Sequence, residues 1–349
     1  MTPRERVLTA LRCGEPDRVP KHIRPSPALA ENLREAIGTD DIDGHFGLEI
    51  RFVALDGLGE PPDVGPYLGD IPEGAVVGPW GTVSARGSFY HFARQIAPMR
   101  DFTDRSELDD YPFPVFSPDL DVMRSRAAKI QSSGLTAVSS YINGPYEQAC
   151  GLRGQAEFLV DLASNERFAA ELLDRITGLK CQMARAQVEA GVDVVWIGDD
   201  LGMQERLVFS PETWRRFIKP CLERITSAIR DASDDVLIAY HSCGHVEPVV
   251  GELADAGVQV LESVQPEAND VARLKQEHGD RLGFWGTVGD QSVLPYGTPD
   301  DVREQVRFRM ETVGKGGGLM IAPAHVVEPE VPVENVLAFF EAVEEYGEY

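Results

Sequence analysis

The chain has 349 residues, a formal net charge of −24 at pH 7, and 43% hydrophobic and 26% charged residues. This acidic composition argues against binding of nucleic acid or anionic membrane by bulk electrostatics, because both need basic surfaces. No apolar run approaches the length of a membrane span, and the polar start does not resemble a secretory signal, so we expect a cytoplasmic protein. Five scattered cysteines fit reduced thiols in such a compartment.

The first 130 residues predict helices and hairpins laid over a larger fold. Residues 3–11 and 27–37 carry apolar side chains at helical spacing. Residues 47–83 are rich in glycine and proline, with short extended pieces at 48–54 and 75–81. Such a pattern is typical of loops and hairpins.

From residue 135 onward, short apolar runs alternate with helix-like segments. The runs predict strands at residues 136–141, 192–197, 236–240, 258–261, 282–285 and 319–322. Helices are predicted at residues 158–190, as one helix or two, and at 212–232, 246–256, 302–313 and 333–345. Strands that alternate with helices indicate parallel pairing through right-handed crossovers.

Six such strands, with one or two from the earlier region, predict an α/β fold of the TIM (β/α)8 barrel type. We expect one barrel domain over residues 1–349. Residues 1–130 would form an N-terminal helical and hairpin elaboration with the first strand, and residues 131–349 the main run of βα units. A doubly wound open sheet is the alternative, but no Gly-x-Gly-x-x-Gly follows an early strand, and the glycine cluster at 314–318 precedes a strand.

Polar side chains follow the predicted strands at the points where they end. In a parallel barrel these ends share one face, and that face carries the active site. Distant stretches of the chain should therefore meet at one rim. The residues concerned are Asn143, Tyr146, Asp199, Asp200, His241, Cys243, Glu262, Gln265, Asp290, Gln291 and His325.

His241 and Cys243 lie two residues apart at a strand end, so their side chains face the same way. A lone cysteine there is more often a core residue, but imidazole beside thiolate favours a zinc site. His325 follows the strand expected to close the barrel and is the candidate third ligand, with Glu262 as a fourth. His245 is expected to start the next helix. The other four histidines, His22, His45, His91 and His278, offer no partner by spacing.

The acidic residues have two interpretations. Asp199 and Asp200 either belong to the site or only bind the amides of a loop or helix start. Glu262 follows a buried strand, where an unpaired carboxylate would be costly, so a pocket role is favoured. Trp80 is a candidate lining residue of the cleft, whereas the other three tryptophans are expected to be packing residues.

Several segments, in this order and spacing, resemble the uroporphyrinogen decarboxylase superfamily. They are residues 2–7 and 15–20, Gly198-Asp199-Asp200-Leu201-Gly202, Ser210-Pro211-Glu212 with Trp214, His241-Ser242-Cys243-Gly244, Phe284-Trp285-Gly286, and Pro332-Val333-Glu334-Asn335. The resemblance covers nearly the whole chain. It implies a single-domain TIM barrel with its cleft at the carboxyl ends of the strands.

Two branches of that superfamily differ in their motifs. True uroporphyrinogen decarboxylases carry Arg-Gln-Ala-Gly-Arg soon after the first helix, which suits an acidic tetrapyrrole. Residues 21–26 lack this motif. Corrinoid-linked methyltransferases, such as the methylcobamide:coenzyme M enzymes, carry His-x-Cys and a later cysteine as zinc ligands. His241 and Cys243 match that pair, whereas His325 replaces the later cysteine, as in the decarboxylase branch.

The resemblance implies a zinc-dependent methyltransferase that moves a methyl group between a small molecule and a corrinoid, a methylcobamide that serves as methyl donor or acceptor. Replacement of a thiolate by a neutral histidine would leave the metal a stronger Lewis acid, which leaves room for methoxy or methylamine substrates beside thiols, for example in an O-demethylase. A separate corrinoid protein is implied as a transient partner.

Roles follow for each candidate residue. The predicted metal ligands are His241, Cys243 and His325. The predicted catalytic residues, which orient substrate or carry protons, are Asp199, Asp200 and Glu262. The predicted substrate-binding residues are Asn143, Tyr146, Gln265 and Trp80. Two alternatives stay open: a metal-independent decarboxylase or lyase in which His325 and an aspartate handle protons, and a non-catalytic protein that binds a corrinoid or tetrapyrrole.

Overall fold

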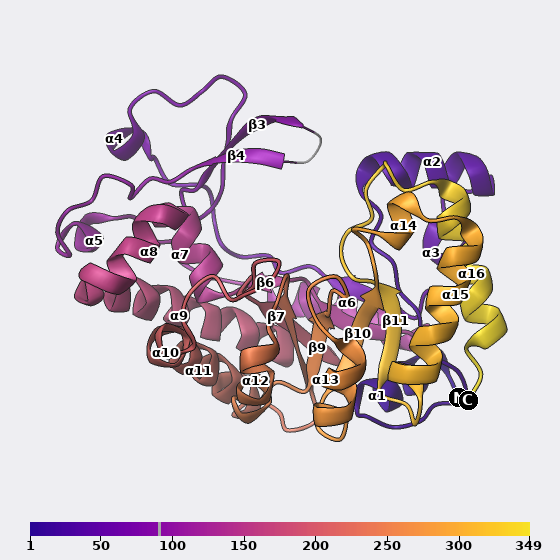
Figure 1. The fold of residues 1–349 in the computed structure, drawn as a ribbon. Helices are drawn as coiled ribbons and strands as arrows, with labels where there is room; N and C mark the ends of the chain where they lie inside the picture. Colours follow the sequence, from indigo (N-terminus) through magenta and orange to yellow (C-terminus); the bar gives the residue numbers. More distant parts are fainter. Residues whose placement is uncertain (90–91) are drawn as a thin grey trace.

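The computed structural model describes residues 1–89 and 92–349, and a curled parallel sheet forms its centre (Figure 1). Neighbouring strands pair in parallel in the order β1, β5, β7, β8, β9, β10 and β11, with the short β6 beside β7. Their bounds are β1 Ile50–Val53, β5 Thr136–Ser139, β6 Ile142–Asn143, β7 Val194–Gly198, β8 Leu237–Ser242, β9 Val260–Ser263, β10 Gly283–Val288 and β11 Leu319–Pro323.

A short N-terminal segment supplies the remaining position of the barrel. His22 donates its backbone N–H to the Ile321 carbonyl, and Ile321 donates to the Pro20 carbonyl, so residues 20–22 run parallel beside β11. On its other side the His22 ring packs edge-on against Phe52 of β1, with ring centroids 5.8 Å apart. The predicted TIM-barrel fold is confirmed, with a first strand that is little more than one bridge.

The predicted helices are confirmed, and some are divided. Residues 158–190 form two helices, α8 and α9, and π-helical turns at Trp214–Ile218 and Met310–Gly314 interrupt or end two others. The bounds are α1 Pro3–Leu11, α2 Pro27–Ile37, α3 Ile42–His45, α4 Gly65–Leu68, α5 Glu107–Asp110, α6 Leu120–Ser132, α7 Pro145–Arg153, α8 Gln155–Ser164, α9 Glu166–Glu189, α10 Pro211–Thr213, α11 Lys219–Arg230, α12 Val250–Asp255 after a 3-10 turn at Glu247–Val249, α13 Val271–His278, α14 Val293–Tyr296, α15 Pro299–Arg309 and α16 Val333–Tyr346.

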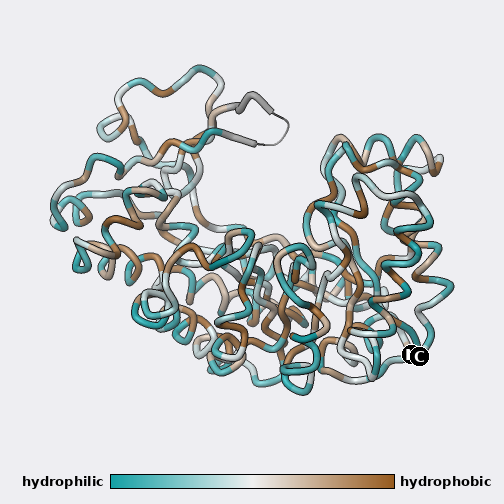
Figure 2. Tube along the Cα trace, in the orientation of Figure 1, coloured by the Kyte–Doolittle hydropathy of each residue, from teal (hydrophilic) through white to brown (hydrophobic). Residues whose placement is uncertain are grey.

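The core explains why the strands read as apolar runs. Parallel strands covered by helices are buried on both faces, and β5, β7 and β11 are buried at every residue. Much of the tube in the strand region of Figure 2 is correspondingly brown. Inside the barrel, Trp196 and Trp285 pack against one another with ring centroids 5.4 Å apart. Val7 and Leu11 of α1 join this inner cluster, so the first helix closes the barrel at one end.

The glycine-rich N-terminal region contributes a second, small sheet. It is antiparallel and consists of β2 (Val76–Val77), β3 (Val83–Phe89) and β4 (Phe92–Ile96), of which only the first coincides with a predicted extended piece. In Figure 1 this sheet stands away from the barrel, above α7 and α8. Among the helices of the described chain, none combines the length and apolarity that crossing a membrane requires.

We predict that Gly286→Ala destabilises the barrel. Gly286 in β10 has φ +124°, and an added Cβ would lie 2.2 Å from the Ser263 carbonyl oxygen of β9. The free energy of unfolding, measured by urea denaturation, should fall by at least about 2 kcal/mol. Gly178→Ala is the matched control: this glycine lies inside α9 with nothing within 4 Å of its Cβ position, so stability should rise by about 0.5–1 kcal/mol. Equal effects at both positions would contradict the prediction.

Candidate metal centre and adjoining cavities

The three predicted metal ligands lie together. His241 is the penultimate residue of β8, Cys243 directly follows that strand, and His325 lies two residues after the end of β11. One ligand atom of each nevertheless lies within 4.8 Å of the others. Cys243 Sγ is 3.4 Å from His241 Nε2. Tetrahedral zinc, with bonds of about 2.1 Å to nitrogen and 2.3 Å to sulfur, separates two such ligands by about 3.6 Å. The donor atoms and their spacing therefore fit this metal.

Glu262 holds the imidazole of His241 from behind. It lies opposite His241 in the parallel register of β8 and β9, and its Oε2 is hydrogen-bonded to His241 Nδ1. Trp196 Nε1 donates to the same oxygen at 3.2 Å, and an Arg24 guanidinium nitrogen lies 3.6 Å from Oε1. Because the two imidazole nitrogens point in different directions, Glu262 orients the ring and leaves Nε2 free to face Cys243. It does not lie on the ligand side of the ring, where a fourth ligand would.

Burial and neighbouring charges shift the pKa values of all three predicted ligands. Burial disfavours a charged His241, but Glu262, Asp200 and Cys243 outweigh this and raise its pKa well above the usual range. Burial raises the pKa of the Cys243 thiol, although His241 opposes the shift. Burial, with His241 and Arg24, lowers the pKa of His325. Since metal ligands must be a thiolate and neutral imidazoles, metal binding here would release protons.

Asp200 connects this cluster to an adjoining cavity. Its Oδ1 accepts the backbone N–H of Cys243 at 2.9 Å and lies 3.4 Å from His241 Nε2. Burial opposes its charge, but His241 and the Cys243 amide lower the pKa of Asp200 to about 2. Asp200 also lines a cavity of about 650 Å³. It is therefore an ionised carboxylate between the predicted ligands and the space for a substrate.

Three predicted substrate-binding residues line the same cavity, and the fourth does not. Trp80, Asn143 and Tyr146 lie in its wall. Gln265 instead lines a smaller cavity of about 290 Å³ together with Cys243 and His325. Its Oε1 accepts the backbone N–H of Gly244 at 2.7 Å, so it fixes the turn that follows Cys243.

Asp199 contacts the start of α7, whereas its neighbour Asp200 contacts the predicted metal ligands. Its Oδ1 accepts the backbone N–H of Glu147 at 2.8 Å, at the start of α7. A Cβ on Gly144, the residue before this helix, would lie 2.1 Å from Asp199 Oδ2, so the carboxylate occupies the place of a side-chain cap. This matches the helix-start interpretation, and a catalytic role of Asp199 stays a prediction.

Sequence reasoning missed a buried lysine. Lys180 of α9 donates to Asn143 Oδ1 at 2.7 Å and to Gln148 Oε1 at 3.2 Å, and its ammonium lies 4.7 Å from the centre of the Trp80 ring. Burial lowers the pKa of Lys180 to about 7. The sequence feature that could have indicated this lysine is its position three residues after Thr177, on the buried face of α9.

Arg24 and His22 also reach the site, because residues 20–22 pair with β11. Arg24 lies 4.6 Å above the Trp196 ring as well as beside Glu262. His22 is buried against Trp285, and burial, with Arg24, lowers its pKa to about 3. Trp196 packs as predicted, but its hydrogen bond to Glu262 adds a role that spacing did not indicate. His91 lies outside the described residues.

The strand ends at the site adopt unusual backbone conformations. Ser263, Val264 and Thr287 have φ values of 84°, 44° and 83°, although none is glycine. Such strain persists only where the surroundings fix it, and it is frequent at functional sites. Here Ser263 Oγ donates to the Ala324 carbonyl at 2.6 Å, which ties β9 to the residue before His325.

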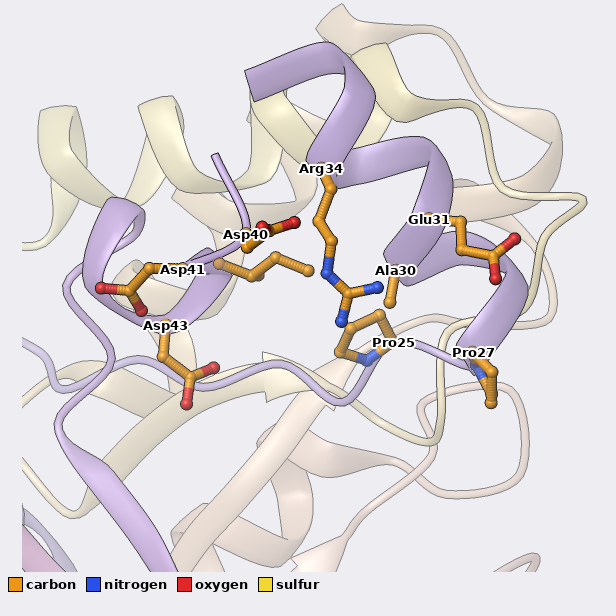
Figure 3. Close-up of a pocket in the computed structure, with 9 residues that line it drawn as sticks. Pro25, Pro27, Ala30, Glu31, Arg34, Asp40, Asp41 and Asp43 are labelled. Atoms are coloured by element: carbon orange, nitrogen blue, oxygen red, sulfur yellow. The ribbon is translucent and has the colours of Figure 1, made fainter. Parts of the chain in front are cut away.

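A further cavity lies apart from these residues. Figure 3 shows it between α2 and α3, where Arg34 and the acidic side chains of Asp40, Asp41 and Asp43 line a space of about 560 Å³. Its described lining contains none of the predicted site residues, so we assign it no part in the chemistry.

Comparisons with known proteins agree on one family. The uroporphyrinogen decarboxylase (URO-D) family profile matches residues 91–346. Methylcobamide:CoM methyltransferase MtaA from Methanosarcina barkeri is 28% identical over 205 residues, which cover 59% of this chain and 57% of that protein. Uroporphyrinogen decarboxylase from Methylococcus capsulatus is 28% identical over 177 residues, covering 51% of this chain and 48% of that protein. The chain thus spans only about half the length of these curated relatives.

A solved structure has the same fold over the whole chain. A methyltransferase from Methanosarcina mazei superposes with a TM-score of 0.71 at 21% identity and covers 99% of both chains. At this identity the likeness is one of fold.

We predict that Glu262→Gln lowers the pKa of His241 in the metal-free protein. The carboxylate is the principal group that raises this pKa, and a neutral amide cannot replace its charge. Histidine titration by NMR measures the shift. Glu341→Gln, an exposed carboxylate on α16, is the control and should leave His241 unchanged.

The same pair makes stability depend on pH. The pKa of His241 is raised in the folded state. Its contribution to the free energy of unfolding is therefore full below about pH 6.5 and is lost as the pH rises through the pKa of the folded protein. The pKa of Glu262 is lowered, since His241 and Arg24 outweigh burial, so its contribution is present above about pH 4.5 and is lost as the pH falls through the folded value. A metal-free protein whose free energy of unfolding does not change with pH in these two ranges would contradict this account.

Proposed function

This chain belongs to the uroporphyrinogen decarboxylase (URO-D) family, and we propose that it is a zinc-dependent methyltransferase that moves a methyl group between a small molecule and a corrinoid. The convergence of His241, Cys243 and His325 carries the proposal. The similarity to methylcobamide:CoM methyltransferases supports the corrinoid as the methyl donor or acceptor.

The donor set supports zinc among the common divalent metals. One thiolate with two imidazoles is a soft to borderline set, which suits zinc and does not suit magnesium or calcium. Three protein ligands leave one coordination position open, as a catalytic zinc site requires. When bound, the zinc supplies Lewis acidity that polarises the oxygen, nitrogen or sulfur of a substrate.

The surrounding residues position the ligands and the substrate. Glu262 fixes the ring and tautomer of His241 by accepting its Nδ1–H. Asp200, ionised at the edge of the 650 Å³ cavity, orients a substrate or carries a proton. Trp80, Tyr146 and Asn143 form the wall against which a methoxy, methylamine or thiol compound binds.

The side of the barrel at which the strands end is also where we expect the proposed partner to bind. A corrinoid carried by a separate small protein would approach the cavity from the side of the strand ends, where the predicted ligands lie. This makes the protein one component of a demethylase system, with a transient contact to the corrinoid protein.

We predict that the purified protein binds one zinc ion per chain and that Cys243→Ser removes most of it. Metal analysis after dialysis measures the stoichiometry. Cys181→Ser is the control, because Cys181 is a half-buried thiol on α9 outside the ligand set and its loss should leave the zinc content unchanged. Zinc-free wild-type protein, prepared and assayed without chelator, would overturn the metal assignment.

We further predict that methyl transfer depends on the metal. With a reduced corrinoid and a methoxy, methylamine or thiol compound, corrinoid methylation is followed by its visible absorbance. His241→Ala or a strong chelator should lower the rate at least about 100-fold, since a Lewis acid supplies several kcal/mol to such a transition state. Activity that survives the chelator, with release of carbon dioxide from a carboxylated substrate, would instead favour the metal-independent decarboxylase. A stoichiometrically bound corrinoid without turnover would favour the binding protein.

A further inference from the structure

The wall of the 650 Å³ cavity contains a glutamine whose amide is held in one orientation. Gln148 lies on α7, is 5% exposed, and lines this cavity together with Asn143. Lys180 donates to Asn143 Oδ1 at 2.7 Å and to Gln148 Oε1 at 3.2 Å. A lysine side chain carries at least two N–H donors whether or not it is charged, so it can supply both bonds. Both amide oxygens are therefore turned towards Lys180.

Gln148 consequently offers only hydrogen-bond donors to the cavity. Its Oε1 also accepts a hydrogen bond from Asn143 Nδ2 at 3.4 Å, so both lone pairs of this carbonyl oxygen are used. Gln148 Nε2 has no hydrogen-bond acceptor among the residues that the structure describes. An amide N–H without an acceptor in a buried side chain is costly. The cavity is the place from which a ligand can supply that acceptor.

Lys180 cannot contact such a ligand itself. Its side chain is 0% exposed, and its ammonium lies 4.7 Å from the centre of the Trp80 ring. The three groups around this ammonium, two amide oxygens and one aromatic ring, all belong to the protein. Lys180 therefore acts on a ligand only through the amide of Gln148, whose orientation it fixes.

The charges around the cavity narrow the kind of acceptor that it can take. Asp200 and Glu147 line the cavity, and none of its described lining residues is a lysine or an arginine. A carboxylate, sulfonate or phosphate group on a ligand would meet the like charge of Asp200 without a cation to pair with, which is costly. An uncharged carbonyl oxygen accepts the amide hydrogens of Gln148 without that repulsion.

We propose that Gln148 determines substrate specificity by donating its Nε2 hydrogens to an uncharged carbonyl oxygen of the substrate, and that Lys180 positions its amide for this contact. This inference rests on the proposed methyl transfer. The substrate is then a methoxy, methylamine or thiol compound that also carries a ketone, ester or amide group. That carbonyl group is bound and takes no part in the reaction.

The inference is tested by calorimetric titration of the purified protein without corrinoid. Two pairs of probes differ only in a carbonyl group against CH2: 4-methoxyacetophenone with 4-ethylanisole, and 3-mercapto-2-butanone with 2-butanethiol. Gln148→Glu keeps an oxygen for Lys180 and Asn143 but replaces the donating NH2 by an acceptor. In this variant the ratio of the two Kd values in each pair should shift at least about 10-fold against the ketone.

Gln182→Glu is the matched control, because Gln182 is exposed on α9, and it should leave both ratios unchanged. An unchanged ratio in Gln148→Glu, or the same shift in both variants, would overturn the proposal. The anionic analogue 4-methoxybenzoate should bind the wild type at least about 10-fold more weakly than 4-methoxyacetophenone. Tighter binding of the anion would overturn the assignment of an uncharged acceptor.

The positioning role of Lys180 is tested by Lys180→Met with the same probes. Without the lysine the Gln148 amide can turn its oxygen to the cavity, so the preference for the ketone should fall at least about 3-fold. The ratio compares two ligands of similar shape within one variant, so a general loss of stability does not change it. A preserved preference would overturn this role. If no probe binds the wild type, the inference fails, whereas zinc content and corrinoid methylation still decide the proposed function.

Discussion

The hydrogen bond between Glu262 and His241 is the contact on which the geometry of this site depends. It arises from sheet register, because β8 and β9 run parallel with His241 opposite Glu262. A carboxylate that is 3% exposed would be costly without partners, and the imidazole, the Trp196 indole and the Arg24 guanidinium all meet it. The price of burial is thus offset by contacts that also aim His241 Nε2 towards Cys243. The register of β8 and β9 therefore sets both the charge pairing of Glu262 and the orientation of His241.

Two carboxyl groups on one cavity have pKa values shifted in opposite directions because their surroundings differ. His241 and the Cys243 amide lower the pKa of Asp200, whereas burial, together with Asp200, raises the pKa of Glu147 to about 7. Environments that push two pKa values apart provide an acid and an anion within one site. The fold achieves this by bringing the loop after β7 against the start of α7.

The sequence predicted the parts of this structure that depend on local pattern. Apolar runs identified the barrel strands, and the period of two along a strand placed His241 beside Cys243. Adjacent residues in an extended chain point to opposite sides, which is why Asp199 caps α7 while Asp200 faces the ligands, but the pattern could not say which does which. Arg24 and Lys180 could not be predicted, because pairing of residues 20–22 with β11 and packing of α9 bring them to the site.

The net charge of the zinc-bound site suggests why His325 stands where related methyltransferases have a cysteine. Under the proposed function, the two charges of zinc and the charge of Arg24 balance the thiolate of Cys243 and the carboxylates of Glu262 and Asp200. A second thiolate would make the centre an anion and would oppose any substrate that develops negative charge on its leaving oxygen. With His325 the centre would be neutral, so a methoxy group could be polarised there. A neutral third ligand would therefore favour substrates whose leaving atom gains negative charge in the reaction.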